Sequence, residues 1–378
     1  MANTVLCQLQ RGFYEIDVRI PNSLFGQPGE PQFHPHLCLV FVPGIDNDKI
    51  NKVFCSLHGG KGTSTNHASS IGILFVDQLT GLYSVNWPLL ERWTCIFVVP
   101  QGQACTGVDP RWGPGNNPYN PYDINSVGPS NPIGITGWDC SKYVRTGYND
   151  GQFLADVSTY IGTRWPGKKK VLSGHSTGGF AANWAWYNQS TLWDHITVCS
   201  GPISQTAYTP TLGNPPARII PYYSQYGFYD DDLGIYNSFV DPAHNQFYAP
   251  TWREQQRSYA AVDYLYVPGQ PVNLDTRISD WTMLQHRIDL DGGSQVVNFN
   301  HAVVDIAPSK GMLRGTRWRW DYQGAQGTKF RLEFLSGLDG TPIGPGGIIP
   351  GSHSPVSHTM CTSHRMVSDW AAHVDIQP

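Results

Sequence analysis

The chain has 378 residues and a formal net charge of −4, and charged residues make up only 14% of it. It has no basic stripe and no long run of like charge, so we expect neither nucleic acid nor an anionic membrane as a partner. No apolar stretch approaches the ~20 residues that span a bilayer, and the first residues lack the charged and apolar regions of a signal peptide. The low charge is typical of exported or particle-associated proteins, but it fixes neither the compartment nor the oligomeric state.

Four of the eight cysteines lie inside apolar, strand-like runs, namely Cys38, Cys55, Cys95 and Cys199. A free thiol in such a run behaves as a small buried hydrophobe, so we expect these four to be reduced core residues. Cys105 and Cys140 flank a long loop and are candidates for a disulfide that closes it, although the sequence alone does not fix the pairing.

Two strands are predicted near the N-terminus. Residues 14–20 alternate between apolar and polar side chains and end at Pro21, and the apolar run 37–42 ends at Pro43. This pattern predicts antiparallel strands at one edge of a sheet.

A buried-type strand over residues 53–57 leads into two adjacent glycines, Gly59 and Gly60. Without side chains, their backbone amides can face a ligand directly. We predict an oxyanion loop in which the amide of Gly60, or alternatively of Lys61, acts together with the amide of Thr177. An ordinary turn at the end of a strand is the alternative interpretation.

After a buried strand over residues 94–100, the stretch 103–138 is rich in proline, glycine and asparagine. Loops of this length inside a domain are usually functional. We therefore predict a wall of the substrate cleft, with Trp112, Tyr119 and Trp138 as substrate contacts. Alternatively, these aromatic side chains only anchor their own loop.

The motif at residues 174–178 has the spacing G-x-S-x-G. A short apolar run ends at Gly174 and a helix-prone run begins after Gly178, which predicts a strand, a sharp turn and a helix with Ser176 at the tip. Bulky residues in place of the glycines would crowd this turn, and the helix that follows directs its first amides at a developing oxyanion. Ser176 is thus a candidate nucleophile, and His175 beside it is a candidate substrate contact. A plain glycine-bordered turn is the alternative, because the chain has 40 glycines.

Strands and helices alternate around this motif. An amphipathic helix is predicted over residues 152–165, and strands are predicted over 196–199 and 219–226. Alternation over residues 52–226 predicts an α/β fold with a mostly parallel central sheet and helices on both faces.

The acid and the base of a catalytic triad are expected further along the chain. Asp230 follows the strand at 219–226 and is the predicted acid, while Asp231 and Asp232 are predicted to be solvated, because three neighbouring carboxylates cannot all be buried in the charged form. The base is expected after this aspartate, because α/β hydrolases use the chain order Ser, Asp, His.

The predicted base is His301, at the tip of an apolar strand that ends at Ala302. This placement favours it over His244 and His286, although a structural histidine is the alternative.

The tail contains a predicted β-hairpin over residues 317–334 and a helix over 362–374. The aromatic face of the hairpin could bind a flat sugar or a polymer, but core packing is the favoured interpretation. Four potential metal ligands lie close together in the sequence, namely His353, His358, Cys361 and His364. Their spacing matches no standard zinc pattern, so we predict no metal.

The chain resembles extracellular polyhydroxyalkanoate (PHB) depolymerases and the related feruloyl and acetyl xylan esterases over residues 14–307. The motifs that carry this resemblance are His58-Gly59-Gly60, Trp112, Asp150-x-x-Phe153, Gly174-His175-Ser176-Thr177-Gly178-Gly179, Gly227-x-x-Asp230-x-x-Leu233 and Asn300-His301-Ala302. The resemblance implies an α/β-hydrolase fold and a serine esterase mechanism with the triad named above. The chain departs from the family at Tyr226, where a histidine is usual, and in the long aromatic segment after Asp230.

We therefore expect an α/β-hydrolase domain over residues 1–310, with insertions at about 103–147 and 233–290. Residues 311–378 are expected to form a hairpin-and-helix extension packed on the same domain. The predicted activity is hydrolysis of a carboxylic ester, without a cofactor, on a polymeric or bulky substrate such as a polyester or an acylated polysaccharide. A binding or structural particle protein on a hydrolase scaffold, and an acyltransferase using the same triad, are the alternatives.

Overall fold

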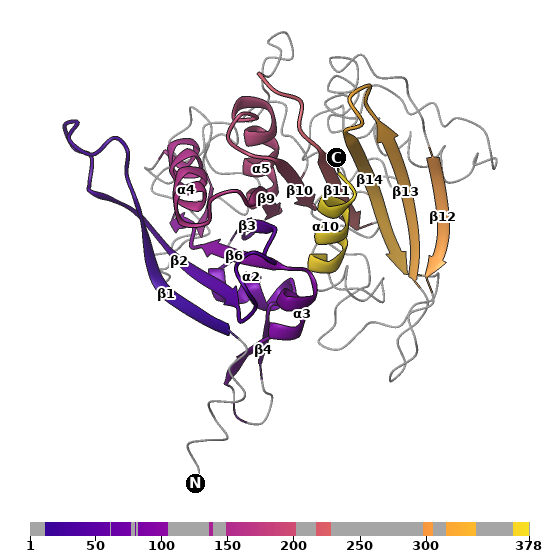
Figure 1. Cartoon of the computed structure of the whole chain (residues 1–378), viewed down its shortest axis with the longest axis horizontal. Coiled ribbons are helices and arrows are strands. Elements are labelled where there is room, and N and C mark those ends of the chain that lie inside the picture. The colour runs from indigo at the N-terminus through magenta and orange to yellow at the C-terminus, as the bar shows by residue number, and fades with distance from the viewer. Residues whose placement is uncertain are drawn as a thin grey trace, which may run out of the picture. The chain divides into compact units, whose positions relative to one another are not determined.

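A computed structural model of the chain describes residues 12–60, 62–76, 80, 82–104, 136–138, 149–201, 217–227, 298–304, 315–337 and 366–377. Contacts within the chain divide it into two units, residues 1–196 and residues 197–378 (Figure 1). The sequence-based division at residue 310 stays a prediction. Among the helices in these ranges, none has the length and apolar character needed to cross a membrane.

The described part of unit 1 contains five main strands: β1 (Gly12–Pro21), β2 (Phe33–Pro43), β3 (Lys52–Leu57), β6 (Cys95–Pro100) and β9 (Lys169–His175). Their order in the sheet is β1-β2-β6-β3-β9. Strands β6, β3 and β9 are parallel, whereas β1 pairs antiparallel with β2 and β2 pairs antiparallel with β6. The predicted antiparallel pair at the sheet edge and the predicted parallel centre are both confirmed.

The described part of unit 1 includes the helices α2 (Ser64–Ser70), α3 (Trp87–Arg92), α4 (Asp150–Arg164) and α5 (Thr177–Asn188). Its short strands are β4 (Leu74–Val76), β5 (Tyr83–Val85), β7 (Gln103–Ala104) and β8 (Thr136–Gly137). Helix α5 contacts β9 and β3, and α2 and α3 contact β6. The sequence predicts α4 and α5 but misses α2 and α3, because helices of two turns or fewer show no apolar periodicity.

The core of unit 1 lies around β3 and β6, which are buried along their whole length. Phe54 of β3 stacks on Phe97 of β6, with ring centroids 4.7 Å apart. Cys38, Cys55, Cys95 and Cys199 are free and buried, as predicted. Burial raises the pKa of the thiols of Cys38 and Cys55, so these thiols are unreactive. The candidate disulfide partners Cys105 and Cys140 lie outside the described residues.

Strand β10 (His195–Cys199) contains the division between the units. The described part of unit 2 then includes β11 (Tyr222–Gly227), β12 (Asn298–Val304), β13 (Gly315–Gln323), β14 (Lys329–Gly337) and α10 (Met366–Asp375). The order β11-β14-β13-β12 is visible in Figure 1. Strand β14 is parallel to β11 and antiparallel to β13, and β13 is antiparallel to β12. The predicted hairpin is confirmed, but its pairing with β11 was not predicted.

A chain of polar contacts runs through the interior of unit 2. The indole N–H of Trp370 in α10 donates to Oε1 of Gln225 at 3.0 Å, and Nε2 of Gln225 donates to the hydroxyl of Tyr223 at 2.7 Å. The Tyr223 hydroxyl in turn donates to the carboxylate of Glu333. All four side chains are buried, so helix α10 is joined to β11 and β14 by hydrogen bonds as well as by apolar packing.

Candidate active site

Ser176 stands in a strained turn between β9 and α5. Its backbone has φ 52° and ψ −118°, a conformation that residues other than glycine rarely adopt. Asp17, Thr94 and Ser200 also have positive φ, but none of them has a glycine two residues before and two residues after it. The strand, turn and helix predicted from the sequence are therefore all present at Ser176.

The two glycines of the motif are required by close backbone contacts. A Cβ atom on Gly174 would lie 2.2 Å from the carbonyl oxygen of Gly178. A Cβ atom on Gly178 would lie 2.5 Å and 2.6 Å from the carbonyl oxygens of Leu57 and His58. All three distances are shorter than real Cβ contacts. Helix α5 therefore packs against the end of β3 only because glycine occupies position 178.

The loop after β3 lies beside the nucleophile. A Cβ atom on Gly59 would lie 2.7 Å from Nδ1 of His175 and 3.0 Å from Cβ of Ser176. Thr177 is the first residue of α5 and is buried, and the first amides of a helix have no partner within the helix. Backbone amides from two elements thus border Ser176. That Gly60 and Thr177 donate to an oxyanion stays a prediction, and Lys61 lies outside the described residues.

The imidazole of His58 holds this loop in place by hydrogen bonds. Its Nε2 accepts the backbone N–H of Gly102 at 2.7 Å, so in the neutral ring Nδ1 carries the proton and donates to the carbonyl of Gly59 at 2.7 Å. Burial lowers the pKa of His58 to about 4, which keeps the ring neutral at pH 7. Gln101 contacts the same Nε2 at 3.2 Å and accepts the backbone N–H of Ser64 at 2.9 Å. The sequence contains no pattern that assigns these roles to His58 and Gln101.

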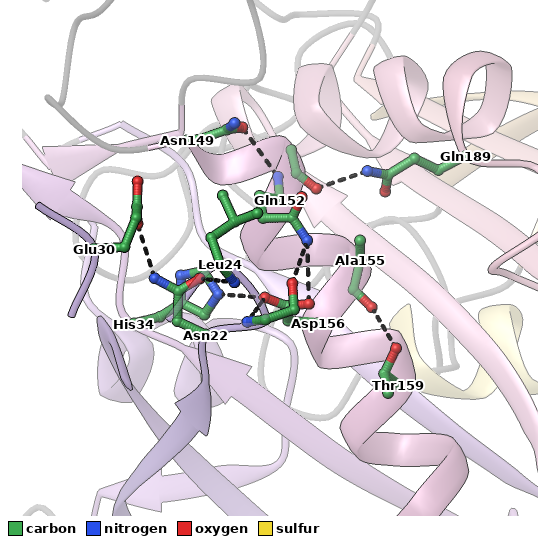
Figure 2. A network of polar contacts seen from close by, with 12 residues as sticks. Asn22, Leu24, Glu30, His34, Asn149, Gln152, Ala155, Asp156, Thr159 and Gln189 are labelled. Atoms are coloured by element: carbon green, nitrogen blue, oxygen red, sulfur yellow. Dashed lines mark hydrogen bonds and ion pairs between the residues drawn. The ribbon is translucent and has the colours of Figure 1, made fainter. Parts of the chain in front are cut away.

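Two histidine–aspartate pairs, also missed by the sequence analysis, attach α4 to β2. His36 Nε2 lies 2.8 Å from Oδ1 of Asp150, and both side chains are fully buried. His34 Nε2 lies 2.7 Å from Oδ2 of Asp156, and Figure 2 shows His34 pointing toward Asp156, whose other carboxylate oxygen accepts from Gln152 at 3.1 Å. Burial alone would raise the pKa of Asp156, but its hydrogen bonds together lower it.

Of the predicted triad, only Ser176 is described with its side chain. Asp230 lies outside the described residues, as do the predicted substrate contacts Trp112 and Tyr119. The backbone of His301 lies in β12, opposite Trp318 of β13. Because β12 continues to Val304, the expectation that the strand ends at Ala302 is wrong. The triad itself stays a prediction.

The two remaining predicted substrate contacts are buried. Trp138 is 0% exposed, donates its indole N–H to the carbonyl of His58 at 2.8 Å and stacks on the ring of His36. His175 is 9% exposed. Their contact with substrate stays a prediction.

Within the described ranges, no group of three or more His, Cys, Asp and Glu side chains is arranged to hold a metal ion. The candidate cluster between His353 and His364 lies outside those ranges, so the prediction that it binds no metal stays open.

Unit 1 therefore contains the parallel strands β6, β3 and β9, an antiparallel pair at the edge, and a sharp strand–serine–helix turn at the carboxyl end of β9. The carboxyl ends of parallel strands are where ligand sites form in α/β proteins. This is the α/β-hydrolase architecture that the sequence predicts.

No protein-family model matches the sequence, and comparison with curated proteins finds no match. Solved structures with a similar backbone include serine hydrolases and esterases. An acetyl xylan esterase from Aspergillus awamori is similar over 90% of this chain and 94% of its own, with 11% identity and a TM-score of 0.41. The fluorophosphonate-binding serine hydrolase FphF of Staphylococcus aureus is similar over 62% and 87%, with 11% identity and a TM-score of 0.34. An S-formylglutathione hydrolase from Agrobacterium tumefaciens is similar over 58% and 77%, with 10% identity and a TM-score of 0.37. Similarity at this level identifies neither a substrate nor catalytic residues in this chain.

Proposed function

We propose that this protein is a serine hydrolase of carboxylic esters, with Ser176 as its nucleophile. The observation that carries the proposal is the backbone of Ser176, whose φ of 52° is held between two glycines that nothing larger could replace. Strain of this kind costs roughly 1–3 kcal/mol and is found mostly at functional sites. A turn without a function would gain stability by relaxing it.

In the proposed mechanism His301 removes the proton of the Ser176 hydroxyl while Oγ attacks the ester carbonyl carbon. Asp230 orients His301 and stabilises its protonated form. The amides of Gly60 and Thr177 stabilise the oxyanion, and His301 then returns the proton to the departing alcohol, which leaves an acyl-enzyme. A water molecule activated by His301 attacks this acyl group and releases the acid.

The substrate class that we propose is a polymeric or bulky ester, either a polyester such as PHB or an acylated polysaccharide. Support comes from the sequence: the long insertion with Trp112 and Tyr119 is aromatic and weakly charged. Such side chains suit an uncharged polymer better than a small ionic ester. A film or suspension of each polymer, with the released acid measured by titration, distinguishes the two.

The first test compares hydrolysis of short p-nitrophenyl esters by the wild type, Ser176→Ala and Ser173→Ala. Ser173 is the matched control, because it is a buried serine of β9, three residues before Ser176, whose hydroxyl donates to the carbonyl of Cys55 at 3.3 Å. We expect Ser176→Ala to lose at least roughly 10⁴-fold in kcat and Ser173→Ala to stay within a few-fold. A fluorophosphonate should label Ser176 in the wild type and in Ser173→Ala.

Equal hydrolysis by the wild type and Ser176→Ala would reject the mechanism. Activity absent from both on small esters and on polymers, together with no labelling, would favour a binding protein on a hydrolase scaffold. If added alcohols outcompete water for the acyl group, the enzyme is an acyltransferase instead.

A further inference from the structure

Trp138 joins the loop beside Ser176 to the interior of unit 1. Its ring is stacked on His36, with centroids 5.6 Å apart and planes 9° apart, and His36 is stacked in turn on Phe153 of α4. Nε2 of His36 also lies 2.8 Å from Oδ1 of Asp150 in α4. The indole of Trp138 is therefore stacked on a side chain that both β2 and α4 hold in place. Its single N–H donates to the carbonyl oxygen of His58 at 2.8 Å.

That hydrogen bond fixes the direction of a backbone amide. The C=O and N–H of a trans peptide point in opposite directions, and no peptide bond in the described residues is cis. Holding the carbonyl of His58 toward Trp138 therefore directs the N–H of Gly59 away from Trp138. The carbonyl of Gly59 is held likewise, by the His58 ring at 2.7 Å and by the N–H of Gly62 at 3.1 Å, which sets the direction of the Gly60 N–H.

The two anchors belong to the loop that carries the proposed oxyanion donor. Gly59 is packed against His175 and Ser176, so this loop begins beside the nucleophile. Stabilisation of an oxyanion depends on donors that are already aligned before the charge develops. A loop of glycines has no intrinsic preference for one alignment, so the alignment must come from groups that hold its carbonyls.

We propose that Trp138 is a positioning residue of the oxyanion site that does not touch the substrate: its hydrogen bond to the His58 carbonyl fixes the His58–Gly59 peptide, from which the next peptide, with the proposed donor Gly60, continues. The assignment rests on the proposed function, and it gives Trp138 a role different from the substrate contact that the sequence suggests. Removing its N–H frees the His58–Gly59 peptide to rotate. The substitution then weakens stabilisation of the transition state, in which the oxyanion forms, and leaves substrate binding unchanged.

Trp193 provides a matched control. It is also a fully buried tryptophan of unit 1, but its indole N–H has no hydrogen-bond partner among the residues that the structure describes. Trp138→Phe and Trp193→Phe thus remove the same atoms from the same kind of environment, and only the first removes a hydrogen bond. Replacement of Trp138 by 3-benzothienylalanine, which keeps the shape of the indole and lacks the N–H, is the second variant should Trp138→Phe fail to fold.

The experiment measures kcat and KM for a p-nitrophenyl ester, and the affinity for a trifluoromethyl ketone, which forms a tetrahedral oxyanion adduct with a catalytic serine. We expect kcat of Trp138→Phe and of the benzothienyl variant to fall roughly 10-fold to 100-fold, somewhat less than for direct loss of a donor. KM should change less than about threefold, and ketone affinity should fall in proportion to kcat/KM. Trp193→Phe should keep wild-type kinetics.

Unchanged kcat in folded Trp138→Phe or in the benzothienyl variant overturns the assignment, and so does an equal loss in Trp193→Phe. A raised KM with unchanged kcat also overturns it and returns Trp138 to the substrate-contact role. Each of these three results leaves the proposed function intact if activity still requires Ser176. If the wild type and Ser176→Ala hydrolyse esters equally, the proposed function fails and the assignment falls with it.

Discussion

The polar contacts of His58, Gln101 and Trp138 in unit 1 and those of Tyr223 and Glu333 in unit 2 lie at different places relative to their strands. In unit 1 the central strands β3 and β6 are buried throughout and largely apolar, and the contacts of His58, Gln101 and Trp138 gather where these strands end. In unit 2 the polar contacts lie within the buried strands themselves, at Tyr223 of β11 and Glu333 of β14.

This difference separates two uses of a buried hydrogen bond. Contacts at the strand ends of unit 1 orient the backbone beside Ser176, so changing them should alter activity more than stability. Contacts within the strands of unit 2 join α10 to the sheet, so changing them should alter stability. The proposed acid and base, Asp230 and His301, also belong to unit 2.

The largest expected effect is that of His301→Ala, which tests whether unit 2 takes part in catalysis at all. Loss of a triad histidine should lower kcat at least roughly 10⁴-fold. The matched controls are His244→Ala and His286→Ala, which should keep wild-type activity in the same p-nitrophenyl ester assay.

Retained activity in His301→Ala would remove His301 from the mechanism. His353 and His358 would then be the next candidates, because they follow β14 in the chain and β14, unlike β12, is adjacent to β11.

Gly178→Ala should have the next largest effect, and it tests the sensitivity of the strand ends in unit 1. Its Cβ would push against the carbonyl oxygens of Leu57 and His58, which displaces the loop that Trp138 holds. A displacement of about 1 Å at a reacting group can cost roughly 10²-fold in rate. Steady-state kinetics and circular dichroism together measure the effect. Wild-type kcat in a folded variant would contradict the close packing of α5 against β3.

Much of unit 1 was predictable from the sequence. Apolar runs bounded by proline and glycine gave the strands, and the spacing of Gly174, Ser176 and Gly178 gave the turn, because both are local properties of the chain. The contacts of Trp138 were not predictable, since its hydrogen bond joins residues 80 positions apart in the chain. The pairing of β14 with β11 was missed for the same reason.

Acidification should destabilise unit 1 through its buried neutral histidines. Burial lowers the pKa of His58 to about 4 and that of His67 to about 3, against about 6.5 in the unfolded chain. The unfolded state therefore takes up protons first, and stability is lost as the pH falls from about 6.5 to those values. Each histidine contributes a slope of about 1.4 kcal/mol per pH unit in this window.

Urea denaturation at pH 7, 6, 5 and 4 measures this slope. His67→Gln should flatten it, because that variant removes one of the two groups. An identical slope in the variant would show that His67 is not buried in the neutral form.

Tyr223→Phe tests the stabilising role of the polar contacts in unit 2. The variant keeps the ring beneath Arg331 and beside His373 but removes the hydroxyl that links Gln225 to Glu333. We expect a loss of roughly 1–3 kcal/mol, seen as faster hydrogen exchange of the amides in β11 and β14. Exchange in β3 and β9 should stay unchanged, and a uniform increase in all four strands would contradict the proposed division of roles.

The smallest expected effect is that of Gly162→Ala, which has the opposite sign to Gly178→Ala. Gly162 lies inside α4, and a Cβ atom there would meet no described atom within 4 Å apart from its chain neighbours and the backbone of its own helix. Alanine restricts the unfolded chain and favours the helix, so the free energy of unfolding should rise by roughly 0.5–1 kcal/mol with kinetics unchanged. Urea denaturation and the ester assay measure both. Replacing glycine by alanine should thus stabilise the protein at position 162 on the helix surface and damage the site at position 178. The reason is that Gly178, unlike Gly162, is packed against backbone atoms of another element. Destabilisation by Gly162→Ala would show instead that glycine is required in α4 as well, and that the contrast between the two positions does not arise from the space around them.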